Sequence, residues 1–455
     1  MSQAASHDVP ALLELVQRLR QRVEQLEQEN AQLRQRVAEL EELPPRSAAP
    51  FRREERRKVP PEQRKKPGRR PGHKGVWRPA PLQIDQRIEL PLSCCPRCGG
   101  PVRHCRPRRQ IIEELPLVRP QVTELITYCG DCPQCGRVYS HHPLQTSHAV
   151  GAAGVQLGPR ALAWAVLLKQ GLGLTARKSC RLLRGLCGLA LSPGGLMQSL
   201  QRLGRKLEGL YQQLQQSLRA SPAVHSDETS WWVGGPSWWL WSFSDPRTTV
   251  YCVEPTRAHD VVEQVLGKRY GGMLVSDCLS SYDPLDCRKH KCIAHHLRAI
   301  AKARDSPGSQ QSGYLREWEL LFQTVLTLHR LYRQGQLDAA TLAQKRPCLQ
   351  EWVGRLLEQQ VSQPGELRIQ HRLGKQRQHL LGCLQEPAAE PTNNRAERSL
   401  RPAVIARKLS CGNRTEPGKR CWEILTSLVV TCEQRKQDPV EYLIPHLRLA
   451  PQSAR

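Results

Sequence analysis

Three acidic residues stand where a carboxylate could bind a metal ion. Asp227 lies in the middle of an apolar, strand-like segment, and Asp277 ends a second one, GMLVSD. Aspartate is disfavoured in strands, and a buried carboxylate is costly unless it is paired or binds a cation. Glu397 lies far along the chain on a predicted helix, in the sequence NNRAERSLRP. We therefore predict that these three carboxylates share one metal site.

The chemistry of such a site follows from its oxygen ligands, which suit Mg²⁺ or Mn²⁺. Two ions about 4 Å apart can activate water or a 3′-hydroxyl and stabilise the leaving oxygen of a phosphodiester. One acid of this kind alone is better explained as an ordinary turn or surface residue. Three of them in a strand–strand–helix arrangement, on a basic chain, favour catalysis with two ions per active site.

Cysteines in two CPxCG turns form a second set of metal-ligand candidates. Four thiolates predict one closed, structural Zn²⁺ site. A thiol redox pair is the alternative, but two such turns joined by strand-like sequence favour zinc. Cys94 and Cys129 are neighbours that could substitute as ligands. The predicted ligands are Cys95, Cys98, Cys132 and Cys135.

The charge of the chain favours a polyanionic partner, most simply DNA. Lysine and arginine total 68 against 42 acidic residues, a net charge of +26. Between Arg46 and Arg78 there are 13 Lys or Arg and 3 Glu in a Pro/Gly-rich stretch. Its charge density suits phosphate contacts, with a solubilising linker as the alternative. The residues expected to contact DNA there are Arg64, Lys65, Lys66, Arg69, Arg70 and Lys74.

Neither a secretory signal nor an apolar run long enough to span a membrane is visible in the sequence. We therefore expect a cytoplasmic, nucleoid-associated protein without a membrane partner.

Residues 12–42 carry leucines at every seventh position, with Val or Asn four residues after the first four of them. Leu at d and Val at a favour a parallel two-stranded coiled coil, in which the single Asn fixes the register. The flanking g and e charges are also attractive in such a pair. We therefore predict a homodimer through this segment; a solitary amphipathic helix is the alternative.

The elements that must position the three acids begin near Ala223. Three strand-like segments are separated by turns at Gly234-Gly235-Pro236 and Asp245-Pro246, and a helix, the strand GMLVSD and the strand KCIAH follow. Residues 314–384 are mostly helical, another helix starts near Thr392, and the last clear one covers about 421–436. This order fits a ribonuclease H-like α/β core with a helical insertion.

The segment of residues 159–220 also has a helical pattern. Thr175 and Ser192-Pro193 are expected to start helices, and Gly188 marks a turn. Two short helices about a glycine turn could form a helix-turn-helix whose second helix enters a DNA groove. A plain helical bundle explains the pattern nearly as well.

The predicted domains follow these changes of pattern. They are a leucine-repeat coiled coil (1–43), a basic linker (44–83), a zinc-binding domain (84–148), a helical region (149–221), a catalytic domain (222–436) with a helical insertion at about 305–388, and a C-terminal tail (437–455).

The motifs HSDET, SDCLSSYD, CIAHHLR and above all NNRAERSLRP with the downstream RK resemble the insertion-sequence 66 family of bacterial transposases. PGRRPGHKG and the CPxCG turns match as well, so that the resemblance covers nearly the whole chain. It implies a ribonuclease H-like D-D-E domain that acts on element ends, with Asp227, Asp277 and Glu397 as its acids. Cys292 and His295 resemble the C-x2-H element of many D-D-E transposases and imply support of the site rather than zinc binding.

One departure from the family is Cys278, where glycine is common after the second aspartate. Around Glu397, the polar residues Asn393, Asn394 and Arg398 either cap the helix or contact the scissile strand, and both interpretations stay open. Downstream on the same segment lie three further candidates for phosphate contacts, for which a solvated face is an equal alternative. They are Arg401, Arg407 and Lys408.

The sequence thus predicts a DNA transposase that cleaves a strand at an element end and joins the 3′-hydroxyl to target DNA. Its expected partners are DNA, a second copy of the chain and accessory proteins of the same element. Two alternatives stay open: a non-catalytic, zinc-containing DNA-binding regulator, and a structure-selective nuclease. Joined products would distinguish the transposase from both.

Overall fold

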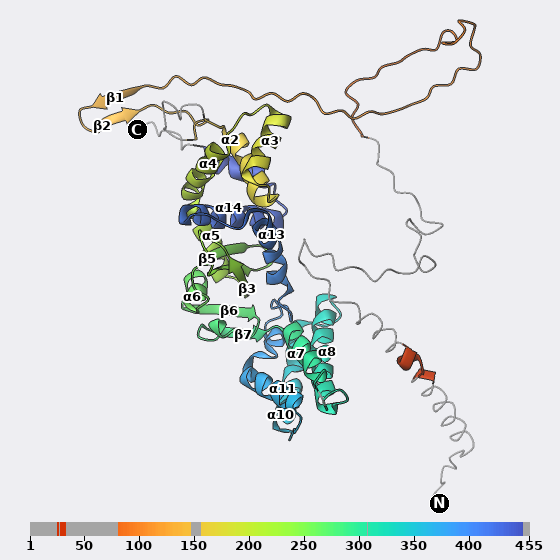
Figure 1. The fold of residues 1–455 in the computed structure, drawn as a ribbon, viewed down its shortest axis with the longest axis vertical. Helices are drawn as coiled ribbons and strands as arrows, with labels where there is room; N and C mark the ends of the chain where they lie inside the picture. The colour runs from red at the N-terminus through yellow and green to blue at the C-terminus, as the bar shows by residue number, and fades with distance from the viewer. Residues whose placement is uncertain (1–24, 27, 33–80, 147–155, 307, 449–455) are drawn as a thin grey trace, which may run out of the picture. The chain divides into compact units, whose positions relative to one another are not determined.

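The computed structural model describes residues 25–26, 28–32, 81–146, 156–306 and 308–448 (Figure 1). The chain divides into two compact units, Met1–Glu113 and Glu114–Arg455. Residues 25–26 and 28–32, within the predicted coiled coil, are helical. The rest of the leucine repeat and the six basic residues predicted to contact DNA in the linker lie outside the described residues, so those hypotheses stay predictions.

A five-stranded mixed sheet lies at the centre of the second unit, in the order β5-β4-β3-β6-β7. The first three strands form an antiparallel meander, whereas β6 pairs parallel to β3 and β7 parallel to β6. The two expected turns, at residues 234–236 and 245–246, separate the strands of the meander. The strands are β3 (Ala223–Trp231), β4 (Trp238–Ser244), β5 (Thr249–Glu254), β6 (Arg269–Ser276) and β7 (Asp286–Lys291).

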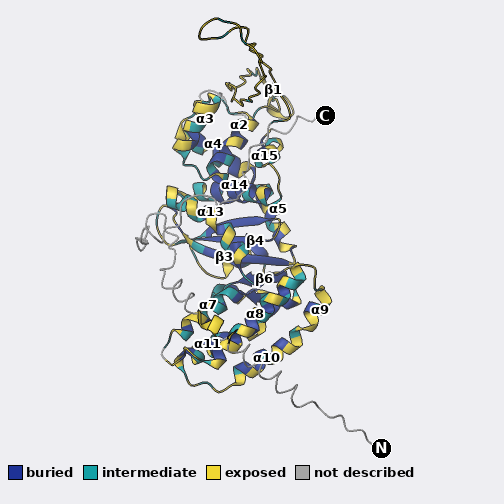
Figure 2. Cartoon of the chain, turned by 90° about the vertical axis from the view of Figure 1, so that its right-hand side faces the viewer, coloured by how far each residue is buried: buried dark blue, intermediate teal, exposed yellow. Residues whose placement is uncertain are grey.

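Helices pack on this sheet and also lie beyond its two edge strands. Figure 2 colours the chain by how far each residue is buried. The helices associated with the sheet and the segment before it are α2 (Pro159–Val166), η3 (Leu167–Gly171), α3 (Ala176–Cys187), α4 (Pro193–Lys206), α5 (Glu208–Arg219), α6 (Asp260–Leu266), α13 (Asn394–Ser410), α14 (Glu416–Gln434) and α15 (Pro439–Leu447). The middle of helix α14, from Cys421 to Cys432, is almost entirely buried, and the helix packs against β5, α4 and α5. It therefore joins the sheet to the N-terminal helices in one hydrophobic core.

The helices between β7 and α13 have a hydrophobic core of their own, centred on Trp318 and Phe322. They are α7 (Ile293–Arg304), α8 (Gly313–Arg333), α9 (Ala339–Gln344), α10 (Arg346–Glu358), α11 (Pro364–Lys375) and α12 (Gly382–Gln385). In Figure 1 they gather beside β7, away from α14. From α8 onward this helical group falls within residues 305–388, where a helical insertion was predicted, whereas α7 precedes that segment.

The expected helix signals before the sheet are confirmed. The Thr175 side chain accepts a hydrogen bond from the Lys178 amide, and Ser192 accepts one from Gly195. Gly188 has a positive φ of 67° at the end of α3, a conformation that glycine adopts at little cost. Helix α4 buries Leu196, Leu200 and Leu203 in the core, so a role in a DNA groove stays a prediction.

Three sequence-based expectations differ from the structure. Within residues 84–143, regular strands occur only at β1 (Cys129–Cys132) and β2 (Gly136–Tyr139), because an alternating segment forms a strand only where another strand pairs with it. The strand expected at KCIAH ends at Lys291, and Ile293 already begins α7. Residues 439–447, expected within a tail, form α15, whose start is capped by the Asp438 carboxylate.

No helix in the described ranges combines the length and the apolar character that a membrane crossing requires.

Candidate active site

Asp227 and Asp277 are placed side by side by the pairing of β3 with β6. These strands run parallel, with His225 opposite Val275. Two residues further along, where side chains return to the same face of the sheet, stand Asp227 within β3 and Asp277, which directly follows the last residue of β6. This face also carries Trp231 of β3, which packs with residues of α13 and α14. The two aspartates therefore share the face of the sheet on which α13 lies.

Glu397 lies in the first turn of α13, which Asn393 ties to β3. The Asn393 side-chain amide donates a 2.7 Å hydrogen bond to the carbonyl of Ser226, next to Asp227. Its backbone amide donates to the Cys292 sulfur at 3.1 Å. The Asn393 side chain is fully buried, and the backbone carbonyl of Asn393 accepts the Glu397 amide at 3.1 Å. Asn393 thus positions the segment that carries the third acid.

The electrostatics of Asp227 reflect this crowding of carboxylates. Burial, followed by the negative charges of Glu228 and Asp277 and, more weakly, of Glu397, raises the pKa of Asp227 to about 7. An acid with so high a pKa marks a place where negative charge is unfavourable unless a cation compensates it. Oxygen donors of this kind suit Mg²⁺ or Mn²⁺, so the residues present fit a divalent cation.

In the described residues, the carboxylates of Asp227, Asp277 and Glu397 do not come together closely enough to hold one ion. No choice of one oxygen from each gives three atoms within 4.8 Å of one another. Glu397 instead contacts the Arg298 guanidinium at 3.4 Å, and the Arg298 side chain is 63% exposed. Asp277 accepts the Leu279 amide at 2.9 Å. Because an exposed ion pair contributes little free energy, the contact with Arg298 holds the Glu397 side chain only weakly.

Cys292 and His295 stand at the start of α7, within the electrostatic range of Glu397. The Cys292 amide donates to the carbonyl of Ser276, and its buried sulfur receives the Asn393 amide. Cys292 therefore links β6, α7 and α13. His295 is half-buried; burial lowers its pKa, whereas the charges of Asp277 and Glu397 raise it. The supporting role that the family resemblance implies for these two residues stays a prediction.

The sequence analysis did not identify a polar network on the face of β3 opposite to Asp227. Glu228 points to the opposite face of β3, with a side chain that is 1% exposed. It accepts hydrogen bonds from Arg257 and from the Tyr282 hydroxyl, the latter at 2.5 Å. The fully buried Lys291 lies 3.0 Å from Asp283 and over the Tyr282 ring. The SDCLSSYD segment that includes Asp277 is thereby attached to β3.

Comparison with known proteins identifies the family of this chain. The model of the transposase IS66 family matches residues 154–420, which include the whole sheet and all three acids. The chain belongs to the IS66 family of transposases. An uncharacterized protein, y4qI of Sinorhizobium fredii (strain NBRC 101917 / NGR234), is 25% identical over 296 residues, or 56% of this chain and 53% of that protein. The chain thus spans about half the length of this curated relative.

The other site residues predicted near Glu397 in this IS66-family chain differ in exposure and in hydrogen bonding. Asn394, Arg398 and Arg401 are exposed on α13. Arg407 instead donates hydrogen bonds to Thr229 and Ser230 of β3, which attach the helix to the sheet. Lys408 is partly buried on the last turn. Phosphate contacts therefore stay a prediction for these side chains, with an internal role already evident for Arg407.

The four cysteines predicted to bind zinc lie in two turns, one in each unit of the chain. In the first turn the Cys95 amide donates to Gly100 at 2.8 Å, and Gly99 has a φ of 75°. In the second, Gly136 has a φ of 72°. Backbone hydrogen bonds lower the pKa of the Cys95 and Cys132 thiols, which favours the thiolate that a metal requires. One site made by all four cysteines stays a prediction.

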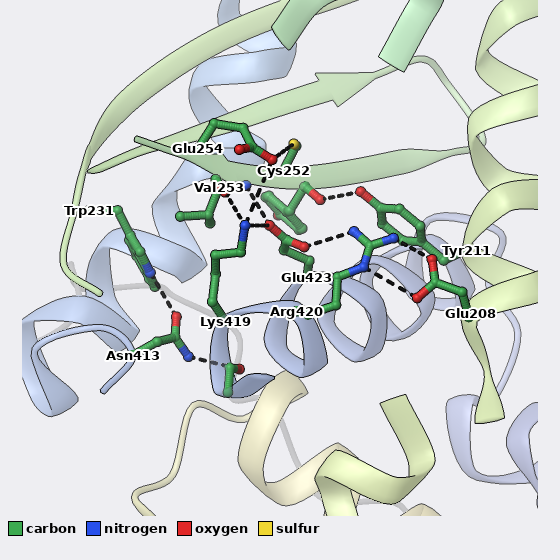
Figure 3. Close-up of polar contacts among 12 residues, drawn as sticks. Glu208, Tyr211, Trp231, Cys252, Val253, Glu254, Asn413, Lys419, Arg420 and Glu423 are labelled. Atoms are coloured by element: carbon green, nitrogen blue, oxygen red, sulfur yellow. Dashed lines mark hydrogen bonds and ion pairs between the residues drawn. The ribbon is translucent and has the colours of Figure 1, made fainter. Parts of the chain in front are cut away.

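A different cluster of ligand-type atoms, at Cys252, Glu254 and Glu423, lies between β5 and α14 (Figure 3). Lys419 approaches Glu423 at 3.5 Å and Glu254 at 3.7 Å, and Arg420 donates to Glu423 at 2.8 Å. The Val253 amide also donates to Glu423 at 2.7 Å. Two cations of the protein therefore already compensate the acids, and this cluster is better explained as an ion-pair network than as a metal centre.

The tryptophans of the β3–β4 hairpin serve mainly in packing. Trp231 and Trp238 face each other across the strands, and the Trp231 ring lies 4.8 Å from Trp422 of α14. Trp241 is fully buried beside Phe243. Cross-strand aromatic pairs of this kind stabilise the pairing of β3 with β4.

Replacing Asn393 by alanine is expected to lower the free energy of unfolding by about 1–3 kcal/mol, because the buried carbonyl of Ser226 loses its donor. Asn393→Asp should cost more, since a carboxylate at this buried position has no hydrogen to donate to that carbonyl. Urea unfolding measures both. Asn394→Ala, next along the chain but exposed, is the matched control, with an expected change below about 0.5 kcal/mol. Equal effects at the two positions would contradict the role of Asn393.

Proposed function

We propose that this chain is a DNA transposase whose active site is formed by Asp227, Asp277 and Glu397. The observation that carries the proposal is the parallel pairing of β3 with β6, which sets two aspartates side by side on the face where α13 lies. The raised pKa of Asp227 supports a site that binds cations. The strand order, with an antiparallel meander and two further parallel strands, supports a ribonuclease H-like core.

In this proposal the protein's own residues serve to position the metal ions and the DNA. Asp227 lies within β3 and Asp277 directly follows β6, and the Asn393 contacts tie the start of α13, which carries Glu397, to β3 and to Cys292. All three would hold two divalent ions, Mg²⁺ or Mn²⁺, which activate water or a 3′-hydroxyl and stabilise the leaving oxygen when bound. Arg298, which pairs with Glu397, offers an exposed cation to a nearby phosphate.

The reaction would proceed in two in-line displacements at phosphorus. Water cleaves one strand at the element end and leaves a 3′-hydroxyl, and this hydroxyl then attacks a phosphodiester of the target DNA. Each displacement breaks one P–O bond and forms another, so no covalent link between protein and DNA is needed. The coiled coil of residues 12–42 would pair two protomers, the basic linker would bind DNA, and the CPxCG turns would hold one structural Zn²⁺. Accessory proteins of the same element are further partners of this proposal.

The experiment that tests the proposal separates the candidate functions by their products. The purified chain is incubated with Mg²⁺, a supercoiled target plasmid and a labelled duplex that carries the end of the DNA element encoding it. A transposase gives cleaved ends and ends joined to the plasmid. Cleavage without joining would indicate a nuclease, and binding without cleavage would indicate a regulator. Either of the last two results overturns the proposal.

A further inference from the structure

Arg372 belongs to α11, which packs closely along α7 in the helical group. Gly365 in the first turn of α11 lies so near α7 that a Cβ atom there would be 2.7 Å from the Ala303 carbonyl oxygen. Ile369 and Leu373 are buried on the same side of α11. The two helices are therefore in contact along the face that also carries Arg372.

The position of Arg372 follows from this packing. It lies seven residues after Gly365, about 10 Å along the helix axis. Ala303 is near the end of α7, whereas His295 and His296 are near its start. Burial lowers the pKa of His296, and the positive charge of Arg372 lowers it further; the Arg372 charge also acts on His295 and on Cys278. Arg372 therefore reaches the end of α7 that borders Asp277 and Glu397.

The Arg372 side chain has no partner of its own among the described residues. Its Nε atom is buried without a hydrogen bond, and the guanidinium makes no ion pair with a carboxylate. Two arginines of α7 differ in this respect, since Arg304 pairs with Glu319 at 3.0 Å and Arg298 with Glu397. A buried donor without an acceptor is unfavourable for folding. An anion that arrives with a ligand would supply the missing acceptor.

We propose that Arg372, from the helical group, binds a phosphate of the DNA strand held at the candidate active site. A guanidinium presents paired N–H donors that match phosphate oxygens, and α11 carries it to the border of the acids. The inference rests on the proposed function, because it takes DNA as the substrate of that site. It gives the helical group a direct part in substrate binding.

The test compares Arg372→Gln with Lys375→Gln, which removes one positive charge from an exposed position on the same helix. Single-turnover cleavage of the labelled element end in Mg²⁺ is expected to fall about 10- to 100-fold for Arg372→Gln and less than about twofold for the control. The melting temperature of Arg372→Gln should stay unchanged or rise, because an unpaired buried donor is removed. Equal activity of the two variants, or a fall in melting temperature that accounts for the loss, would overturn the inference.

Methylphosphonate substitution locates the contact. Neutral linkages are placed one at a time near the cleavage site, and binding is measured with Ca²⁺ in place of Mg²⁺. Wild type should lose affinity at one position where Arg372→Gln loses none, whereas Lys375→Gln should behave as wild type. The same losses in wild type and Arg372→Gln at every position would contradict a phosphate contact. Wild-type protein that binds but never cleaves in Mg²⁺ would reject the proposed function instead, and this binding assay still decides the role of Arg372.

Discussion

Asp227→Asn is expected to abolish strand cleavage and joining while making the metal-free protein more stable at pH 8. The loss of activity should be on the order of a thousandfold or more, because the amide removes a charged ligand of ions that lower the barrier by several kcal/mol. The surroundings of Asp227 raise its pKa to about 7, so they disfavour its ionised form. At pH 8 the wild-type carboxylate is ionised and destabilises the folded chain, whereas the neutral amide of Asp227→Asn does not.

The sign of the pH dependence follows from the two pKa values of Asp227. Its ordinary value is 3.8 and its value in the folded chain is about 7, so the folded state binds this proton more tightly. As the pH rises from about 4 to 7, the unfolded state loses the proton first and wild-type stability falls. Discounted for partial exposure, the full effect is about 2–4 kcal/mol. Asparagine has no such proton, so the advantage of Asp227→Asn should be full at pH 8 and shrink as the pH falls toward 4.

Thermal melting of protein dialysed free of Mg²⁺, at pH 8 and pH 5, measures this difference. Adding Mg²⁺ should raise the melting temperature of wild type, because a ligand that binds the folded state stabilises it, and should have little effect on Asp227→Asn. Glu317→Gln, at an exposed position of α8, is the control that removes one negative charge elsewhere. An Asp227→Asn protein that still joins strands, or that melts below wild type at pH 8, would contradict the assignment.

The sheet and its two aspartates were predictable because their signals are local. Apolar segments bounded by Gly-Gly-Pro and Asp-Pro turns mark the meander, and an aspartate in such a segment is conspicuous. The strand β7 was misplaced by a few residues because it pairs only with β6 at the edge of the sheet. Its sequence DCRKHK is mostly polar, and edge strands with polar residues lack the apolar pattern that identifies central strands.

The contacts that hold the site together were not predictable, because they join residues far apart in the chain. Asn393 donates to Ser226, 167 positions earlier, and nothing in NNRAER indicates that partner. Arg372 lies in a helical segment with many charged residues, and only the packing of α11 on α7 distinguishes it from Lys375. The ion-pair network of Glu423 was not predictable, because Glu423 lies in a long, largely apolar helix and its spacing in the sequence does not indicate its partners.

Glu423→Ala is expected to produce the largest loss of stability, about 3–5 kcal/mol, because it breaks a buried ion-pair network on one side only. The Glu423 side chain is 1% exposed and receives Lys419, Arg420 and the Val253 amide (Figure 3). Without it, the two cations lose their shared carboxylate and a buried amide of β5 loses its acceptor. Since α14 joins the sheet to the N-terminal helices, the loss should weaken the whole second unit.

The measurement is the melting temperature, which should fall by roughly 10 °C, together with urea unfolding. Glu433→Ala, at an exposed position of the same helix, should change stability by less than about 0.5 kcal/mol. Combining Glu423→Ala with Lys419→Met should recover part of the loss, because the second change removes a cation left without its partner, and the energies of such neighbours are not additive.

If Cys252, Glu254 and Glu423 instead held a metal, removing Lys419 alone would strengthen that site, and Lys419→Met would gain stability when Zn²⁺ or Mn²⁺ is added. The ion-pair network predicts that Lys419→Met loses stability whether or not these ions are present, because Lys419 also donates to the Val253 carbonyl at 2.7 Å.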